Sequence, residues 1–426
     1  MVARKTTCLR RLGWNRAGEE RAGRFFASKK VTAAKIVASW GERTGPASAG
    51  RHVLAIQDTT AVKFTTTSDR RRGLGKVGHG NIHGILAHTM MAVDADSGAC
   101  LGLVTGEIWN RPGKVAPLRG RTLDQRESKR WIETAERAKT VLAPAETITV
   151  MGDSESDMYP VWCRVGEPGV HLLVRAQSDR RLTTGGTLFA AADGLAVADT
   201  RTIELKARPP ARAKRTAKLE LRFTAVEICR PVNEKDRTLA ETVRLSLVEV
   251  REVDAPEGAE PIVWRLLTTH AVTDTAMAWQ IVDWYRWRWT IEQLFRVTKS
   301  EGLGLEDSRM ASAERLMKLA AAALKAACID MMLVQERDGA HGLPASIAFS
   351  DAEIETIEAL SPTLEGKTDR QKNPHPPRSL ARASWVMGRL GGWNCYYGPP
   401  GPIAMRRGRE YFQAAHRGRM LGSKLE

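Results

Sequence analysis

One short stretch, residues 284–300 (WYRWRWTIEQLFRVTKS), restricts the fold more than any other part of the chain. If it forms a helix, with about 100° per residue, five polar side chains fall within an arc of about 80°: Tyr285, Arg288, Glu292, Arg296 and Lys299. That face then carries one carboxylate among cations and a phenol. Three Trp occur in the first six residues, and exposed indoles are unfavourable. The stretch therefore predicts a helix with one side packed on a core and the other side charged.

The charged face has two interpretations. Phosphate chemistry requires a carboxylate that holds a divalent cation, together with Arg, Lys and Tyr side chains that bind the flanking phosphates. The alternative is an ordinary amphipathic helix, with Arg–Glu pairs in solvent and Trp in the core. The helix alone leaves both interpretations open.

The net charge favours a polyanionic partner. The 426 residues include 65 Lys and Arg against 49 Asp and Glu, which gives +16, a balance that ribosomal, membrane-surface and nucleic-acid proteins share. The six Cys are scattered without a CxxC pair, so we expect mostly buried thiols in a reducing cytoplasm, and neither zinc nor disulfides. No apolar run reaches about eighteen residues, so no membrane span is expected.

The region 51–177 predicts the first part of an α/β core. Three strands with short links favour an antiparallel meander: VLAIQ at 53–57, ILAHTMMAV at 85–93 and LGLVTGEIW at 101–109. The pattern then predicts a helix, a strand, a helix and a strand, at 124–142, 147–151, 154–165 and 171–176. Asp58 is expected at the end of the first strand and Asp153 just after the fourth.

The region 178–261 alternates with period two, which predicts β hairpins in an inserted β module. Its turn between Lys206 and Lys218 is basic and broken by Pro. A strand at 262–268 returns to the core.

The other segments are expected to be mainly helical. Thr273 or Asp274 is expected to cap the long helix that contains residues 284–300. Spacing predicts another packed helix at 311–337 and a basic final helix, whereas 1–50 offers one helix, around residues 32–40.

Three acids are brought together by this topology. If the first and fourth strands are neighbours in a mixed sheet, their ends place Asp58 beside Asp153, and the long helix adds Glu292. Oxygen ligands from three elements suit Mg²⁺ or Mn²⁺ better than Zn²⁺, and two ions about 3.5 to 4 Å apart would support in-line phosphoryl transfer. Taken singly, Asp58 could equally cap a turn and Asp153 a helix.

The three acidic motifs together carry a family resemblance. QDTTAV at 57–62, GDSESDMY at 152–159 and Y-x2-R-x3-E-x6-K at 285–299 resemble the DDE transposases of the insertion-sequence-four group, typified by the Tn-five transposase. The resemblance implies an α/β fold: a ribonuclease-H-like mixed-sheet catalytic core with an inserted β module and a helical C-terminal region.

The resemblance divides the chain into five regions. They are an incomplete N-terminal DNA-binding region, the two parts of the core with the β insertion between them, and a C-terminal dimerisation region: 1–50, 51–177, 178–261, 262–340 and 341–426. Because the first motif begins near the N-terminus, recognition of transposon ends is expected to be weak.

Residue by residue, the resemblance implies that Asp58, Asp153 and Glu292 are the catalytic and metal-binding triad. It implies that Trp264 and Trp289 stack on a base flipped out of the duplex. The residues expected to bind DNA phosphates are Arg175, Tyr285, Arg288, Arg296 and Lys299. One departure concerns the pocket for the flipped base, because Ile85 and Leu86 stand where the best-known member has a Trp pair.

The residues and the resemblance together predict a Mg²⁺-dependent enzyme, with Mn²⁺ as the substitute ion, that performs cut-and-paste DNA transposition. It would act as a homodimer that holds transposon ends and target DNA in a synaptic complex, at the nucleoid in a bacterial cytoplasm and without a membrane. Two alternatives remain open: a ribonuclease-H-like nuclease, which needs the same acids but no base-stacking Trp, and a non-catalytic DNA-binding or inhibitory remnant.

Overall fold

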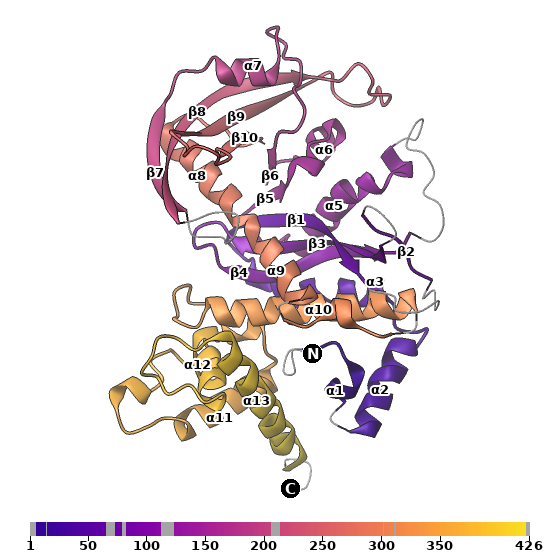
Figure 1. Cartoon of the computed structure of the whole chain (residues 1–426), viewed down its shortest axis with the longest axis vertical. Helices are drawn as coiled ribbons and strands as arrows, with labels where there is room; N and C mark the ends of the chain where they lie inside the picture. Colours follow the sequence, from indigo (N-terminus) through magenta and orange to yellow (C-terminus); the bar gives the residue numbers. More distant parts are fainter. Residues whose placement is uncertain are drawn as a thin grey trace.

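The computed structural model describes residues 6–13, 15–64, 73–78, 82–111, 123–205, 214–300, 302–310 and 312–422. Its centre is a mixed sheet of ten strands, with helices packed around it (Figure 1). Five strands form the core of the sheet, in the spatial order β4-β3-β1-β5-β6: β1 (His52–Lys63), β3 (His83–Asp94), β4 (Cys100–Trp109), β5 (Thr147–Gly152) and β6 (Val170–Arg175).

The directions of these strands define the fold class. β3 runs antiparallel to both β1 and β4, whereas β1, β5 and β6 run parallel to one another. Numbered along the chain, the five strands lie in the order 3-2-1-4-5, with only the second reversed, which is the ribonuclease-H-like arrangement. The predicted meander and the predicted pairing of the first and fourth strands are confirmed. The short β2 (Gly75–Lys76) adds to β3.

Helices cover both faces of this core sheet, which explains why the strands are apolar runs and not alternating ones. Eleven of the twelve residues of β3 are buried. In Figure 1, α10 (Ala313–Gln335) crosses below the sheet, and α5 (Arg130–Val141) and α6 (Tyr159–Arg164) lie above it. The small buried side chains of α10, which include Ala320, Ala323 and Ala327, let this helix lie close to its neighbours.

The strands of the region 178–261 continue the same sheet. β10 (Val263–Thr268) pairs with β6 on one side and with β9 (Thr242–Val253) on the other, followed by β8 (Arg215–Cys229) and β7 (Asp199–Leu205). All four strands are antiparallel to their neighbours, as hairpins require. The part of the basic turn at 206–213 lies outside the described residues.

The long helix predicted around residues 284–300 is interrupted. Asp274 does cap its start, since its side chain accepts a 2.8 Å hydrogen bond from the Met277 N–H. At Arg288, however, the chain forms a tighter turn, with the Arg288 N–H bonded to the carbonyl of Tyr285 at 3.1 Å. This i to i−3 bond divides the segment into α8 (Thr275–Trp287) and α9 (Trp289–Lys299).

Two other predicted helices start later than expected. The segment at 124–142 begins with the 3-10 turns η2 (Leu123–Gln125) and η3 (Glu127–Lys129) before α5. The segment at 154–165 begins with the 3-10 turn η4 (Ser154–Ser156), and α6 starts only at Tyr159. Pro160 explains the second case, because proline has no N–H and fits only the first turn of a helix.

The described part of residues 1–50 contains four helices where one was predicted: α1 (Leu9–Leu12), α2 (Arg16–Ala27), α3 (Ala33–Ala38) and α4 (Gly41–Ala47). Two of them, α2 and α3, are held by contacts with α10. The ammonium group of Lys318, 1% exposed, donates to the carbonyls of Phe26 at 3.3 Å and Ser28 at 3.0 Å, and the Trp40 indole donates to the carbonyl of Ala321 at 3.2 Å.

The C-terminal region is helical, as predicted, with α11 (Asp351–Thr363), α12 (Leu380–Leu390) and α13 (Pro402–Gly422). All six thiols are free, but only Cys100 and Cys328 are fully buried, so the expectation of mostly buried thiols is wrong. Within the described ranges, no helix has the length and apolar character needed to cross a membrane.

Candidate active site

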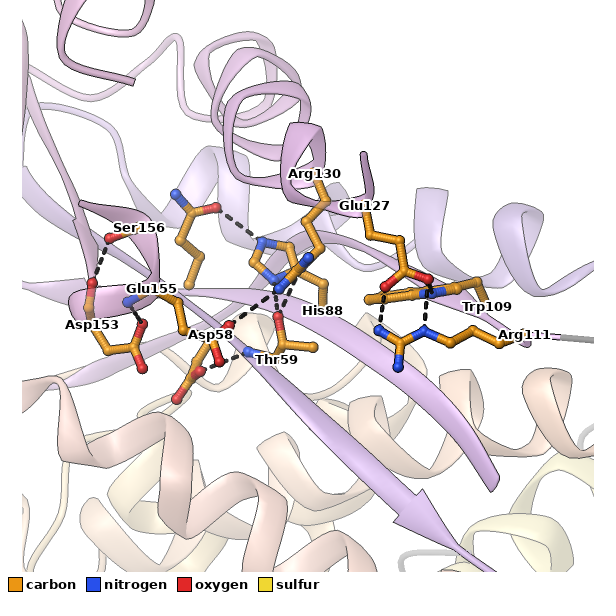
Figure 2. A network of polar contacts seen from close by, with 11 residues as sticks. Asp58, Thr59, His88, Trp109, Arg111, Glu127, Arg130, Asp153, Glu155 and Ser156 are labelled. Carbon is orange, nitrogen blue, oxygen red and sulfur yellow. Dashed lines mark hydrogen bonds and ion pairs between the residues drawn. The ribbon is translucent and has the colours of Figure 1, made fainter. Parts of the chain in front are cut away.

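The first two predicted acids lie at equivalent positions in neighbouring strands. The parallel pairing of β1 with β5 ends at Ile56 opposite Met151, and Asp58 and Asp153 each follow two residues later. Partners in a parallel register point to the same face of the sheet. Figure 2 shows the two carboxylates next to each other beyond the paired segment.

The position of Asp58 within its strand differs from the prediction. β1 does not end at residue 57 but continues to Lys63, because β3 pairs with it along its whole length, with Asp58 opposite Thr89. Asp58 is therefore held by strand pairing on one side and open on the side where β5 has ended.

Arg288 links the third acid to the first. Its guanidinium donates to the Asp58 carboxylate at 3.3 Å and to the Glu292 carboxylate at 2.8 Å. The Arg288 side chain is 8% exposed and that of Asp58 is 15% exposed, so the contact between these two residues is shielded from water. The tight turn at Arg288 thus lies where the helix meets the sheet, and it directs one cation toward two carboxylates.

The acids influence one another electrostatically. Burial, the neighbouring charge of Asp153 and, to a smaller extent, that of Glu292 together raise the pKa of Asp58 to about 7. The Thr59 backbone N–H and the Arg288 guanidinium oppose this rise. A carboxyl group with this pKa is about half ionised near neutral pH, and a bound cation would favour its charged form.

The donor groups fit a hard divalent cation, although they do not form a finished cage. Across the described residues, no three Asp, Glu, His or Cys side chains are gathered closely enough to hold a metal ion. Arg288 supplies the positive charge between Asp58 and Glu292 in this structure. Carboxylate oxygens are the ligand type that Mg²⁺ and Mn²⁺ prefer.

Four of the five predicted phosphate-binding residues lie near these acids. They are Arg288, described above, and Lys299, Arg175 and Tyr285. Burial lowers the pKa of Lys299, and the charge of Asp58 is one of the smaller effects that oppose this. Arg175, exposed at the end of β6, reaches the hydroxyl of Ser154 at 3.4 Å. Tyr285 is 2% exposed, and its ring lies 5.8 Å from the Arg288 guanidinium. Arg296 is on the exposed side of α9.

The two predicted stacking residues line one pocket. Trp264 of β10 and Trp289 of α9, together with Trp279 of α8, border a cavity of about 430 Å³ between the second half of the sheet and the helices. Trp289 is 43% exposed, and the Trp264 ring packs edge-on against Tyr285 at 5.4 Å. Tyr285 therefore contacts both the Trp264 wall of the pocket and the Arg288 guanidinium.

A polar network behind the aspartates was not predicted (Figure 2). It is centred on Arg130 at the start of α5, whose side chain is 11% exposed. Burial and the charge of Arg130 lower the pKa of His88 well below its usual value, so this buried imidazole is neutral. One signal was present in the sequence, because His88 is the one basic residue in the apolar run ILAHTMMAV.

The fold and these groups define a class of protein: a ribonuclease-H-like mixed-sheet protein with an acidic site at the edge where β1 and β5 diverge. Comparison with known families gives the identification. The chain belongs to the transposase DDE domain family, whose model matches residues 49–329. The matched range contains all three predicted acids.

A solved structure similar to this chain is the cryo-EM structure of the piggyBac transposase synaptic complex with hairpin DNA. The TM-score is 0.35 at 10% sequence identity, and the likeness covers 86% of this chain and 57% of that chain. The chain thus spans less than two thirds of that protein.

Proposed function

We propose that this chain is a DNA transposase of the insertion-sequence-four group that cuts DNA at the ends of an insertion sequence and joins them to target DNA. The observation that carries the proposal is the equal offset of Asp58 and Asp153 in neighbouring parallel strands, with Glu292 linked to Asp58 through Arg288. Membership of the transposase DDE domain family supports it.

Asp58, Asp153 and Glu292 would hold Mg²⁺ or Mn²⁺, as two ions. When bound, such ions supply Lewis-acid stabilisation to the attacking and leaving oxygens of an in-line phosphoryl transfer. The chain itself must first free its ligands. Asp58, with a pKa of about 7, loses its proton, and Arg288 releases the carboxylates that it bridges.

Once released, Arg288 is placed to bind a DNA phosphate, since guanidinium groups pair with phosphate oxygens in the same forked geometry as with carboxylates. Lys299 and Arg296 extend this cationic face along α9, and Arg175 approaches from the end of β6. Tyr285 is buried against Arg288 and Trp264, so in this proposal it holds both side chains in place besides contacting phosphate.

The pocket between Trp264 and Trp289 would accept a base that leaves the duplex next to the cut. Its volume of about 430 Å³ and its indole walls suit a flat aromatic ring. Base–aromatic stacking contributes about 1 to 3 kcal/mol per base. Replacing Trp264 with Ala should therefore slow the step that needs an extruded base more than the first nick.

The division into five regions belongs to the same proposal: an N-terminal DNA-binding region (1–50), the catalytic core (51–177 and 262–340), the β insertion (178–261) and the dimerisation region (341–426). Two copies would pair two transposon ends and the target DNA in a synaptic complex, at the nucleoid in the cytoplasm of a bacterium.

The test uses the full chain with duplexes that end in the inverted repeats flanking its gene. Asp153→Asn and Glu292→Gln should abolish Mg²⁺-dependent cleavage and joining while DNA binding persists, since each removes a ligand charge and no core packing. Asp274→Asn exchanges one good N-cap for another at the start of α8, so it is the matched control and should cut at the wild-type rate.

The outcomes separate the candidate functions. Cleavage without any joining of ends would favour the nuclease, and DNA binding without metal-dependent cleavage would favour the non-catalytic protein. Wild-type rates in Asp153→Asn would refute the assignment of the metal ligands.

A further inference from the structure

Each of the two aspartates accepts a hydrogen bond from the backbone of a residue that follows it. The Thr59 N–H donates to the Asp58 carboxylate at 2.7 Å, and the Glu155 N–H donates to the Asp153 carboxylate at 2.9 Å. The position of each carboxylate therefore depends on where Thr59 and Glu155 are held.

One side chain holds both of these residues. Arg130 donates through Nε to the Thr59 hydroxyl at 3.0 Å and through Nη2 to the Glu155 carboxylate at 3.3 Å. Figure 2 shows Arg130 descending from α5 toward Thr59, with Glu155 beside Asp153 on the adjacent loop. The guanidinium thus connects β1, which carries the first acid, to the turn after β5, which carries the second.

The hydrogen-bond directions on the β1 side are fully determined. The amide NH₂ group of Gln57 donates to the Trp131 carbonyl at 3.3 Å, so its oxygen accepts from Nε2 of His88 at 3.1 Å. Nδ1 of His88 is then unprotonated and accepts from the Thr59 hydroxyl at 2.8 Å. The same hydroxyl oxygen accepts from Arg130, so each member of this chain has its partner.

Arg130 is itself fixed by its surroundings. Its guanidinium lies 5.6 Å from the Trp109 ring and 5.5 Å from the Trp131 ring. Trp109 is held in turn by Glu127, which accepts from its indole at 3.1 Å and also pairs with Arg111. A guanidinium that lies within 6 Å of two indole rings and is hydrogen-bonded to two residues cannot change its orientation without breaking several contacts.

We propose that Arg130 is a positioning residue that sets the relative placement of Asp58 and Asp153, with the chain of Thr59, His88 and Gln57 fixing its contact to β1. The inference deepens the proposed function, on which it rests, because it concerns the support of the metal ligands and not the ligands themselves. Residues that orient metal ligands typically change metal affinity about 10- to 100-fold when replaced.

The shape of arginine is essential to this role. A lysine at position 130 would keep the positive charge, but its single ammonium group cannot reproduce two donors in a fixed plane. Arg130→Lys should therefore weaken Mn²⁺ binding about 10- to 100-fold. Arg137→Lys is the matched control on the same helix, because Arg137 is exposed and donates to the hydroxyl of Thr134 within α5.

Replacing Thr59 provides a second test of the positioning role, with a smaller change in the side chain. Thr59→Val keeps the shape of the side chain but removes the hydroxyl that links Arg130 to His88, so it should weaken Mn²⁺ binding in the same direction. Thr59→Ser keeps the hydroxyl and should restore binding to near the wild-type level. If Thr59 had a purely structural role, Thr59→Ser and Thr59→Val would differ in melting temperature but not in Mn²⁺ affinity.

The experiment titrates Mn²⁺ into the full-length wild type and the variants, with binding followed by electron paramagnetic resonance and folding checked by circular dichroism. Wild-type affinity in folded Arg130→Lys and Thr59→Val would overturn the positioning role. If the wild type binds Mn²⁺ and the variants lose affinity, but no DNA is cut, the positioning role stands and the proposed function fails. No Mn²⁺ binding by the wild type would overturn both.

Discussion

Replacing Asp58 with Asn should stabilise the metal-free protein at neutral and higher pH. Asp58 has a pKa of about 7 in the folded protein against 3.8 ordinarily. Between these values the folded state binds more protons than the unfolded state, so the free energy of unfolding falls as pH rises. Asn has no charge to titrate, so the variant escapes this loss.

The size of the effect follows from the shift. Each pH unit inside the window costs the wild type about 1.4 kcal/mol, so from about pH 5 to about pH 8 the variant should gain about 2 to 3 kcal/mol relative to the wild type. Saturating Mg²⁺ should reverse the order, because a ligand that binds only the folded state stabilises it and the variant lacks one ligand.

The measurement is urea unfolding in EDTA, followed by tryptophan fluorescence at both pH values, and then repeated with Mg²⁺. Asp274→Asn, the N-cap exchange at the start of α8, serves as the control, and its free energy of unfolding should match that of the wild type at both pH values. A difference between Asp58→Asn and the wild type that stays constant with pH would refute the electrostatic reasoning about the site.

Three further predictions concern stability. Burial lowers the pKa of His270 from 6.5 to about 3, so between these pH values the folded state binds fewer protons than the unfolded state, and the free energy of unfolding decreases as the pH falls. His270→Gln should lose less stability than the wild type between neutral and acidic pH, as measured by melting curves at both. An equal loss in the variant and the wild type would contradict the lowered pKa of His270. Lys318→Met removes the donor to two backbone carbonyls, which should cost about 1 to 3 kcal/mol of stability and speed amide hydrogen exchange in α2 but not in β1. Unchanged exchange in α2 would show that the Lys318 hydrogen bonds do not stabilise this helix. Gly408→Ala places a methyl group 1.6 Å from a carbonyl oxygen of α12, so it should lower the melting temperature. Its control, Gly418→Ala, meets nothing within 4 Å and should leave the melting temperature unchanged or slightly raised. Similar melting temperatures for the two variants would refute the close packing of α12 and α13.

Much of the fold followed from local pattern. Apolar runs bounded by turn residues predicted the core strands, and the N-cap at Asp274 predicted the start of α8. The late start of α6 was also readable, since Pro160 restricts where a helix begins. The extent of β1 was not, because QDTTAVK is polar and forms a strand only through its pairing with β3. The N-terminal helices likewise depend on contacts with α10, and the side chain that anchors them, Lys318, comes from far along the chain.

The candidate site could likewise be predicted from the sequence only in part. The proximity of Asp58 and Asp153 could be predicted, because the pairing of the first and fourth strands places the two positions side by side. The role of Arg130 could not, because its contact with Thr59 spans 71 residues and its helix was expected to begin elsewhere. His88 and Gln57, polar residues in apolar strands, were the available signal that something buried required hydrogen bonds.

The matched offset of the two aspartates has a consequence for how such a chain can evolve. Their strands are held side by side by backbone pairing, so substitutions among the apolar core residues can accumulate without moving the carboxylates, provided that the contacts of Arg130 are kept. Insertion or deletion of a single residue between His52 and Asp58 would instead turn one carboxylate to the other face of the sheet. Descendants of this gene should therefore vary in the apolar residues of β1 and β5, but keep Gln57, Thr59 and the length of both strands up to the acids unchanged.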